Sequence, residues 1–210
     1  MVSNCNLYRY VFGRDDLSIG SRVLWCYLCT QVSLDVAGAG KDLAEVLTAR
    51  SGEVYLEGVS YDEIPSKLQM SRYRYKVAMS ELASKGIYDD DLLYFPVAML
   101  DAGFFDLKSK AGMTPWDYVL YSWIMDRIEY GGGNMTDVTN GAIAAGLGIS
   151  EDSVKQRKKG LYLRGCLKVV RQGSVVYCAD GDALARDGVP RPPKVSSRKK
   201  ERMHTNLDRF

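Results

Sequence analysis

Histidine is almost missing from this chain of 210 residues, which holds a single one, His204, close to the C-terminus. A histidine-paired nucleophile, a nuclease with two histidine ligands and a two-histidine zinc peptidase all need imidazole groups on the folded part of the chain. The only acidic cluster, Asp89 to Asp91, has no neighbouring catalytic residues in the sequence. We therefore expect a protein that is not an enzyme.

Long apolar runs are missing as well. No stretch approaches the roughly 20 apolar residues that span a bilayer. The opening sequence MVSNCNLYRY has no apolar core of the kind that a signal peptide carries. We expect a cytoplasmic protein with no membrane partner.

The five cysteines, Cys5, Cys26, Cys29, Cys166 and Cys178, are odd in number and do not follow the spacing of a disulfide framework. Cys26 and Cys29 form a C-x2-C pair, but no second pair or histidine pair completes a zinc site. The loop VAGAGKD fails as a phosphate loop because aspartate stands at both its first-glycine and its Ser/Thr positions. We expect buried free thiols and no cofactor or metal.

The clearest pattern present is a helix-turn-helix in residues 60–87. Ser60 is an N-cap residue, and Glu63 three residues later completes a capping box. Apolar residues follow at helical spacing, and Ser71 caps a second helix. Gly86, after Lys85, is typical of a helix end. The second helix begins with several cations.

The same pattern recurs in residues 139–167, which align on the first copy without a gap at an offset of 79. The matching positions are the two caps, the core and the stop: Ser60 with Thr139, Ser71 with Ser150, Leu82 with Leu161, and Lys85-Gly86 with Arg164-Gly165. Upstream, residues 17–28 match residues 113–124 at an offset of 96, so the first copy holds 17 extra residues in the region 40–58. An internal repeat decides the fold class of a chain.

Each copy also has helix and strand signals around this motif. We expect an extended lead-in at 7–12, a helix from Ser18 to about Val32, a break at 36–40 and a short helix at 41–49. We expect strands at 53–57, 92–97 and 134–138, a helix starting at Thr114-Pro115, a turn at 131–133 and a hairpin of 167–170 with 174–177. The composition changes after about residue 185, where prolines and charges predict disorder. Residues 186–210 hold eight basic and three acidic side chains, a net of +5 in a chain of +2, so the rest sums to −3.

With helix, strand, helix-turn-helix and hairpin in this order twice, the chain resembles tandem winged-helix proteins. The expected fold class is mainly α with small β-hairpins (α+β), in two tandem winged-helix domains. The boundaries are 1–100 for the first domain, 101–184 for the second and 185–210 for a basic, disordered tail. Two winged helices in one small chain are similar to plasmid and phage replication initiators, and LKSKAGMTPWDYVLYSWI loosely resembles the start of an initiator winged helix.

The resemblance implies that the second helix of each motif enters the major groove of DNA. It nominates four residues in the first copy, five in the second, and four more for the backbone or minor groove: Arg72, Tyr73, Arg74 and Lys76; Lys155, Gln156, Arg157, Lys158 and Lys159; Arg164, Lys168, Arg171 and Gln172. Arg157 and Lys158 match the core positions of Ala78 and Met79. The sequence therefore does not decide which of the five residues in the second copy point outward. Glu151 and Asp152 at its start repel phosphates, and the acidic residues 89–91 are not assigned a DNA contact.

We therefore expect sequence-specific binding of double-stranded DNA, in replication initiation or control on a plasmid, phage or other mobile element. Transcriptional regulation is the alternative role, with self-association or replication and transcription proteins as further partners. A rival hypothesis is a protein-interaction module of tandem winged helices that does not touch DNA.

Overall fold

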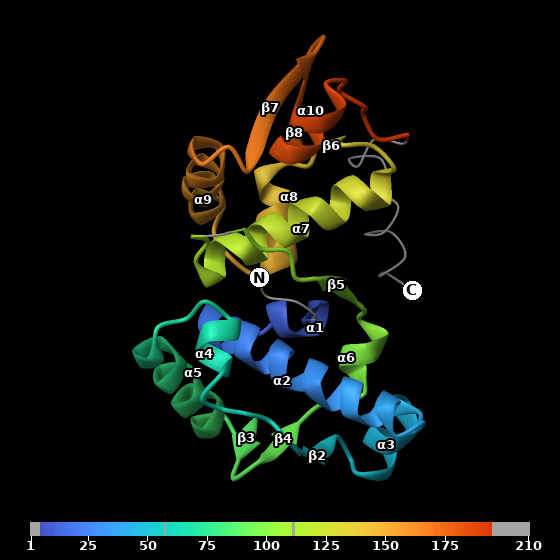
Figure 1. Cartoon of the computed structure of the whole chain (residues 1–210), viewed down its shortest axis with the longest axis vertical. Helices are drawn as coiled ribbons and strands as arrows, with labels where there is room; N and C mark the ends of the chain where they lie inside the picture. Colours follow the sequence, from blue (N-terminus) through green and yellow to red (C-terminus); the bar gives the residue numbers. More distant parts are fainter. Residues whose placement is uncertain (1–4, 57, 111, 195–210) are drawn as a thin grey trace. The chain divides into compact units, whose positions relative to one another are not determined.

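The structure is a computed structural model that describes residues 5–56, 58–110 and 112–194 (Figure 1). The chain divides into two compact units, Met1–Val119 and Leu120–Phe210. It is a mixed α and β protein, 52% helical and 15% strand, with small antiparallel sheets. The domain boundaries expected at residues 100 and 184 stay a prediction.

The first unit is built around one long helix, α2. Its elements in chain order are β1 (Asn6–Tyr8), α1 (Arg9–Phe12), α2 (Ile19–Gly38), α3 (Leu43–Ala49), β2 (Glu53–Tyr55), α4 (Ile64–Lys67), α5 (Arg72–Ser84), β3 (Tyr88–Asp89), β4 (Leu92–Tyr94), α6 (Ala98–Asp101) and β5 (Phe104–Asp106). Strands β2, β4 and β3 form one antiparallel sheet in this spatial order, and β1 pairs with β5.

The second unit has a similar plan, and its first helix, α7, begins just before the division between the units. The elements are α7 (Pro115–Gly131), β6 (Met135–Thr136), α8 (Asn140–Leu147), α9 (Glu151–Leu163), β7 (Leu167–Gln172), β8 (Val175–Asp180) and α10 (Gly181–Asp187). The sheet order is β6-β8-β7. With α3 set aside, both units contain an α-β-α-α-β-β series in which the last strand lies between the other two.

Four helix starts follow the caps that the sequence predicts. The hydroxyl oxygens of Ser18, Ser71, Thr139 and Ser150 each accept the backbone N–H three residues later, at 3.3, 3.3, 3.1 and 3.2 Å. Such a bond satisfies one of the N–H groups that a helix start leaves without a partner. These predictions are confirmed.

The ends of α5 and α9 are also alike. Gly86 and Gly165 have φ of 64° and 71°, a left-handed conformation that glycine adopts without a steric penalty. The next N–H, of Ile87 or Cys166, then donates back to a helix carbonyl at 3.0 Å in both cases. The predicted glycine stops are confirmed, and in both copies the backbone turns from the helix into the hairpin in the same way.

Each unit has its own apolar core, and in each the first helix of the α-β-α-α-β-β series is bonded to the last strand of that series. The Trp25 indole N–H donates to the Tyr94 carbonyl oxygen at 2.8 Å, and the Tyr121 hydroxyl bonds Asp180 at 3.1 Å. Fully buried side chains of the two cores include Trp25, Leu28, Ile64, Leu82 and Leu93, and Trp123, Ile124, Ile143, Leu147, Val154 and Leu161. All five cysteines are buried free thiols, which confirms the expectation for the pair Cys26 and Cys29. Burial raises the pKa of Cys5 to about 12, which keeps this thiol protonated.

Ser60 does not cap a helix, which corrects the expected capping box. Helix α4 begins only at Ile64 and has four residues, with Glu63 at the N-cap and no side-chain cap bond. The Glu63 carboxylate instead pairs with Lys67 at 2.9 Å, and Pro65 lies in the first turn. Proline suits this position because its missing N–H would have had no helical partner there.

Other differences concern the ends of elements. Residues 36–38, expected in a break, continue α2, and Gly40 with φ of 68° follows the helix end. Residues 7–12 form the end of β1 and the short helix α1. The two-residue strand β3, which was not expected, pairs with β4 to make a short hairpin.

The start of the expected disordered tail is ordered. Residues 185–187 complete α10, and residues 188–194 run along the end of α7. The Asn134 amide holds this segment, because its Nδ2 donates to the Val189 carbonyl at 2.9 Å and its Oδ1 accepts the Arg191 N–H at 2.6 Å. The Lys194 N–H donates to the Gly131 carbonyl at 3.0 Å. Residues 195–210, with the basic run 198–200, lie outside the described residues.

Candidate nucleic-acid interface

Helix α5 is fixed to α2 through one carboxylate. Glu81 accepts hydrogen bonds from the Ser18 backbone N–H at 2.9 Å and from the Ser18 hydroxyl at 2.6 Å, and a further one from Ser21. Burial raises the pKa of Glu81, but these hydrogen bonds outweigh burial and leave the pKa below its usual value. A carboxylate at a helix start is also favoured by the helix dipole. The contact sets which side of α5 faces the core and which side faces outward.

The outward side of α5 begins with the four residues nominated in the first copy. Arg72, Tyr73, Arg74 and Lys76 are all exposed, Tyr73 at 77%. None of the three cations has a side-chain hydrogen bond or ion pair with any residue that the structure describes. Cations near a helix start are disfavoured by the dipole. The helix dipole therefore does not account for the three cations at this helix start.

Three of these residues line a hollow of about 470 Å³ at the turn between α4 and α5. Arg72, Tyr73 and Lys76 line it together with the half-buried Tyr75. The other lining residues are Tyr61, Asp62 and Pro65. The hollow thus combines two cations with aromatic surface, a combination that suits a phosphate and a sugar or base.

The acidic turn 89–91 of the first unit has a structural use. Asp91 accepts hydrogen bonds from the hydroxyls of Tyr61, at 2.5 Å, and Tyr88, at 3.2 Å. Burial and the bond to Asp91 both raise the pKa of the Tyr61 hydroxyl, so it remains a donor at neutral pH. This network ties the α4 approach to the β3–β4 hairpin. No local sequence pattern indicates this network, because Tyr61 and Asp91 are 30 positions apart.

Helix α9 distributes its five nominated residues over two sides. Arg157 and Lys158 are half-buried, and the Lys158 ammonium donates to the Asn140 amide oxygen at 3.1 Å. Lys155, Gln156 and Lys159 are exposed. Lys155 pairs with Asp152 at 2.9 Å, a hydrogen bond that raises the pKa of the lysine. The outward face is therefore the side of 155, 156 and 159, with Arg157 and Lys158 extending along the edge of the core.

The remaining nominated residues lie after α9. Arg164 is exposed at the C-cap of the helix. Lys168, Arg171 and Gln172 are exposed on β7, and the last two adjoin the turn at Gly173, which has φ of 59°. Lys168 and Arg171 have no side-chain partner among the described residues. The β7–β8 hairpin is a projecting element with two available cations.

Over residues 5–56, 58–110 and 112–194, no group of three or more histidine, cysteine or acidic side chains is arranged to hold a metal ion. In the same residues, no helix combines the length and apolar character needed to cross a bilayer. No family model, curated protein or solved structure matches the chain.

Proposed function

We propose that the chain is a sequence-specific double-stranded DNA-binding protein made of two winged-helix units. Helices α5 and α9 would be the recognition helices, and β7–β8 the wing of the second unit. One observation supports this most: each unit has the α-β-α-α-β-β series with its last strand in the middle of the sheet, and the third helix of each series presents cations outward.

The residues at the start of α5 support DNA better than a solvated surface. A solvated helix face usually mixes charges of both signs, and its first turn favours acids. Here Arg72 and Arg74 flank the exposed ring of Tyr73. Arginine can donate two hydrogen bonds to a guanine edge, and recognition helices contact bases with their N-terminal residues.

The biological role is proposed from the resemblance in the sequence. Two reading units in one small chain suit replication initiation or its control on a plasmid, phage or other mobile element. Transcriptional regulation is the alternative. In either role, the two helices would occupy major grooves about 34 Å apart if they lie on one face of the duplex.

A protein-interaction module is the second candidate. Three apolar side chains of the second unit favour it, since Leu163, Val169 and Val176 are 78%, 54% and 50% exposed. Exposed apolar residues are common on protein surfaces, however, and only a contiguous patch marks an interface. These side chains support DNA-independent pairing less strongly than the cations support DNA.

Selection from a random duplex pool tests the proposal. The whole chain should enrich a site with two elements about 10 base pairs apart. Arg72→Ala should relax one position of this site, at a cost of about 1–3 kcal/mol for a lost base contact. Arg14→Ala, which removes a cation paired with Asp16, is the matched control and should leave the site unchanged. A chain that enriches no duplex above background would favour the interaction module.

A further inference from the structure

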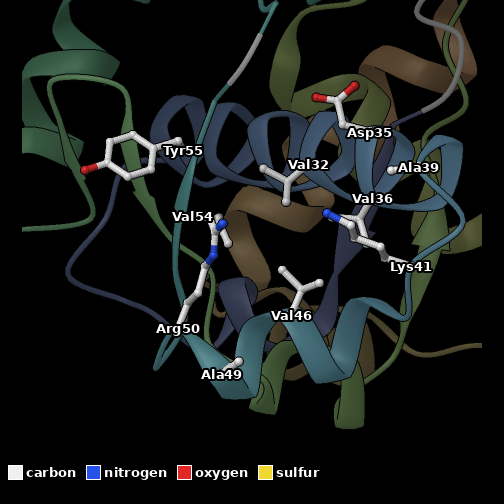
Figure 2. A pocket seen from close by; sticks show the side chains of 10 residues that line it. All are labelled: Val32, Asp35, Val36, Ala39, Lys41, Val46, Ala49, Arg50, Val54 and Tyr55. Atoms are coloured by element: carbon white, nitrogen blue, oxygen red, sulfur yellow. The ribbon is translucent and has the colours of Figure 1, made fainter.

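The 17 extra residues of the first copy help to line a pocket beside α2. They include α3 and the turn into β2, and α3 lies beside the C-terminal part of α2 (Figure 2). The space enclosed by α2, α3 and β2, here the α2–α3 pocket, has a volume of about 280 Å³. The α-β-α-α-β-β series is complete without α3 in the second unit, so the fold does not require this pocket.

Two cations point into the α2–α3 pocket from opposite sides. Figure 2 shows the Lys41 ammonium and the Arg50 guanidinium directed inward above Val46. Neither has a side-chain hydrogen bond or ion pair with any described residue. Asp35 also lines the pocket, but its carboxylate points away from both. Two cations and one acid leave one positive charge to be balanced.

Four valines contribute apolar surface to the pocket between the cations. Val32, Val36, Val46 and Val54 line it, from three different elements. Pockets for drug-sized ligands have volumes of about 300–1,000 Å³, so this pocket suits a smaller molecule. A ligand that matches both features has one carboxylate and a short branched or cyclic hydrocarbon body.

We propose that the α2–α3 pocket binds a small organic monocarboxylate, with its carboxylate between Lys41 and Arg50 and its hydrocarbon part on the four valines. Lysine and arginine bind carboxylates through charge-assisted hydrogen bonds, the stronger class of such bonds. Burial of the hydrocarbon part supplies the rest of the affinity. This site is separate from the DNA-facing residues of α5, and the proposal does not depend on DNA binding.

Valine methyl NMR on the whole chain, without DNA, tests this. Isovalerate and benzoate are the probes, and isovaleramide and benzamide are their neutral counterparts. We expect shifts of the Val32, Val36, Val46 and Val54 methyls with the carboxylates, with a dissociation constant of about 1 mM for ligands of this size. The amides should bind at least about tenfold more weakly, since they lack the charge.

Matched variants locate the effect. The double variant K41Q/R50Q should weaken isovalerate binding at least about tenfold, whereas K41R/R50K keeps both charges and should stay within about threefold of wild type. R186Q/K194Q removes the same charges elsewhere and should bind as wild type. The proposal is overturned if the valine methyls do not respond, or if amide and acid bind alike. It is also overturned if K41Q/R50Q binds isovalerate as wild type does, or if R186Q/K194Q weakens binding at least about tenfold.

Discussion

The salt dependence of DNA binding gives the most quantitative test of the proposed interface. The proposed interface contains six exposed cations that have no side-chain partner among the described residues: Arg72, Arg74 and Lys76 on α5, and Lys159, Lys168 and Arg171 in the second unit. Each phosphate contact adds about −0.9 to the slope of log K against log salt concentration. If Arg72 and Arg74 contact base edges, as proposed, and the other four cations contact phosphates, the slope is about −3.6, and raising salt fourfold weakens binding about 150-fold.

The triple variant R72Q/R74Q/K76Q should bring this slope to about −2.7. The same fourfold rise in salt then weakens binding only about 40-fold. Fluorescence anisotropy with a labelled duplex of about 30 base pairs measures both slopes between about 50 and 200 mM salt, the range in which counterion release is usually seen. Melting temperatures of the variants show whether each chain is folded.

The control for this test is R14Q/K85Q. It removes two cations of the same unit that already pair with Asp16, at 2.7 and 3.5 Å, so these side chains are less available to phosphates. We expect a slope within about 0.5 units of wild type. The reasoning is refuted if R72Q/R74Q/K76Q keeps the wild-type slope, or if the control changes it equally.

Three further changes test the surrounding structure. Glu81→Gln should lower the melting temperature at pH 7 and have a smaller effect as the pH falls below 4.5, because a carboxylate with a lowered pKa stabilises above its unfolded pKa of 4.5 and loses this effect as pH falls through the folded value. A loss that is the same at every pH would contradict this. Gly146→Ala places a methyl group 2.8 Å from the Trp123 indole nitrogen. We therefore expect the free energy of unfolding, measured in urea, to fall by about 1–3 kcal/mol. An unchanged unfolding midpoint would disprove the close packing. The double variant Glu151→Gln with Asp152→Asn should bind DNA more tightly, as measured by anisotropy, because it removes repulsion between these acids and the phosphates. It should also cost roughly 0.5 kcal/mol of helix stability per charge removed. An unchanged affinity would place this helix start away from DNA.

The sequence predicted the parts of the fold that depend on local chemistry. Caps at Ser71 and Ser150 and stops at Gly86 and Gly165 each depend on a few neighbouring residues, so the pattern alone locates them. The exposed cations on α5 were nominated correctly as an outward group for the same reason. Their nomination as DNA contacts stays a prediction.

The features that escaped prediction depend on distant contacts. Strand β3 is held by the network of Tyr61, Tyr88 and Asp91, and residues 188–194 are held by the amide of Asn134. The α2–α3 pocket likewise needs side chains from three elements. The sequence alone did not predict the outward side of α9. The half-buried Lys158 donates to Asn140 in another helix, a contact that helical periodicity does not reveal.

The two recognition helices are not equivalent under the proposed function. At the offset of 79, the first three residues of α5, Arg-Tyr-Arg from Arg72, correspond to Glu-Asp-Ser from Glu151 in α9. Base edges are contacted mainly from the first turns of such helices, and acids there repel phosphates. Base discrimination would therefore come mainly from α5, while the second unit would grip the backbone through Lys159 and the β7–β8 hairpin. It follows that variants of α5 should alter the selected sequence, whereas Lys159→Gln should weaken all duplexes alike and reduce the salt slope by about one unit.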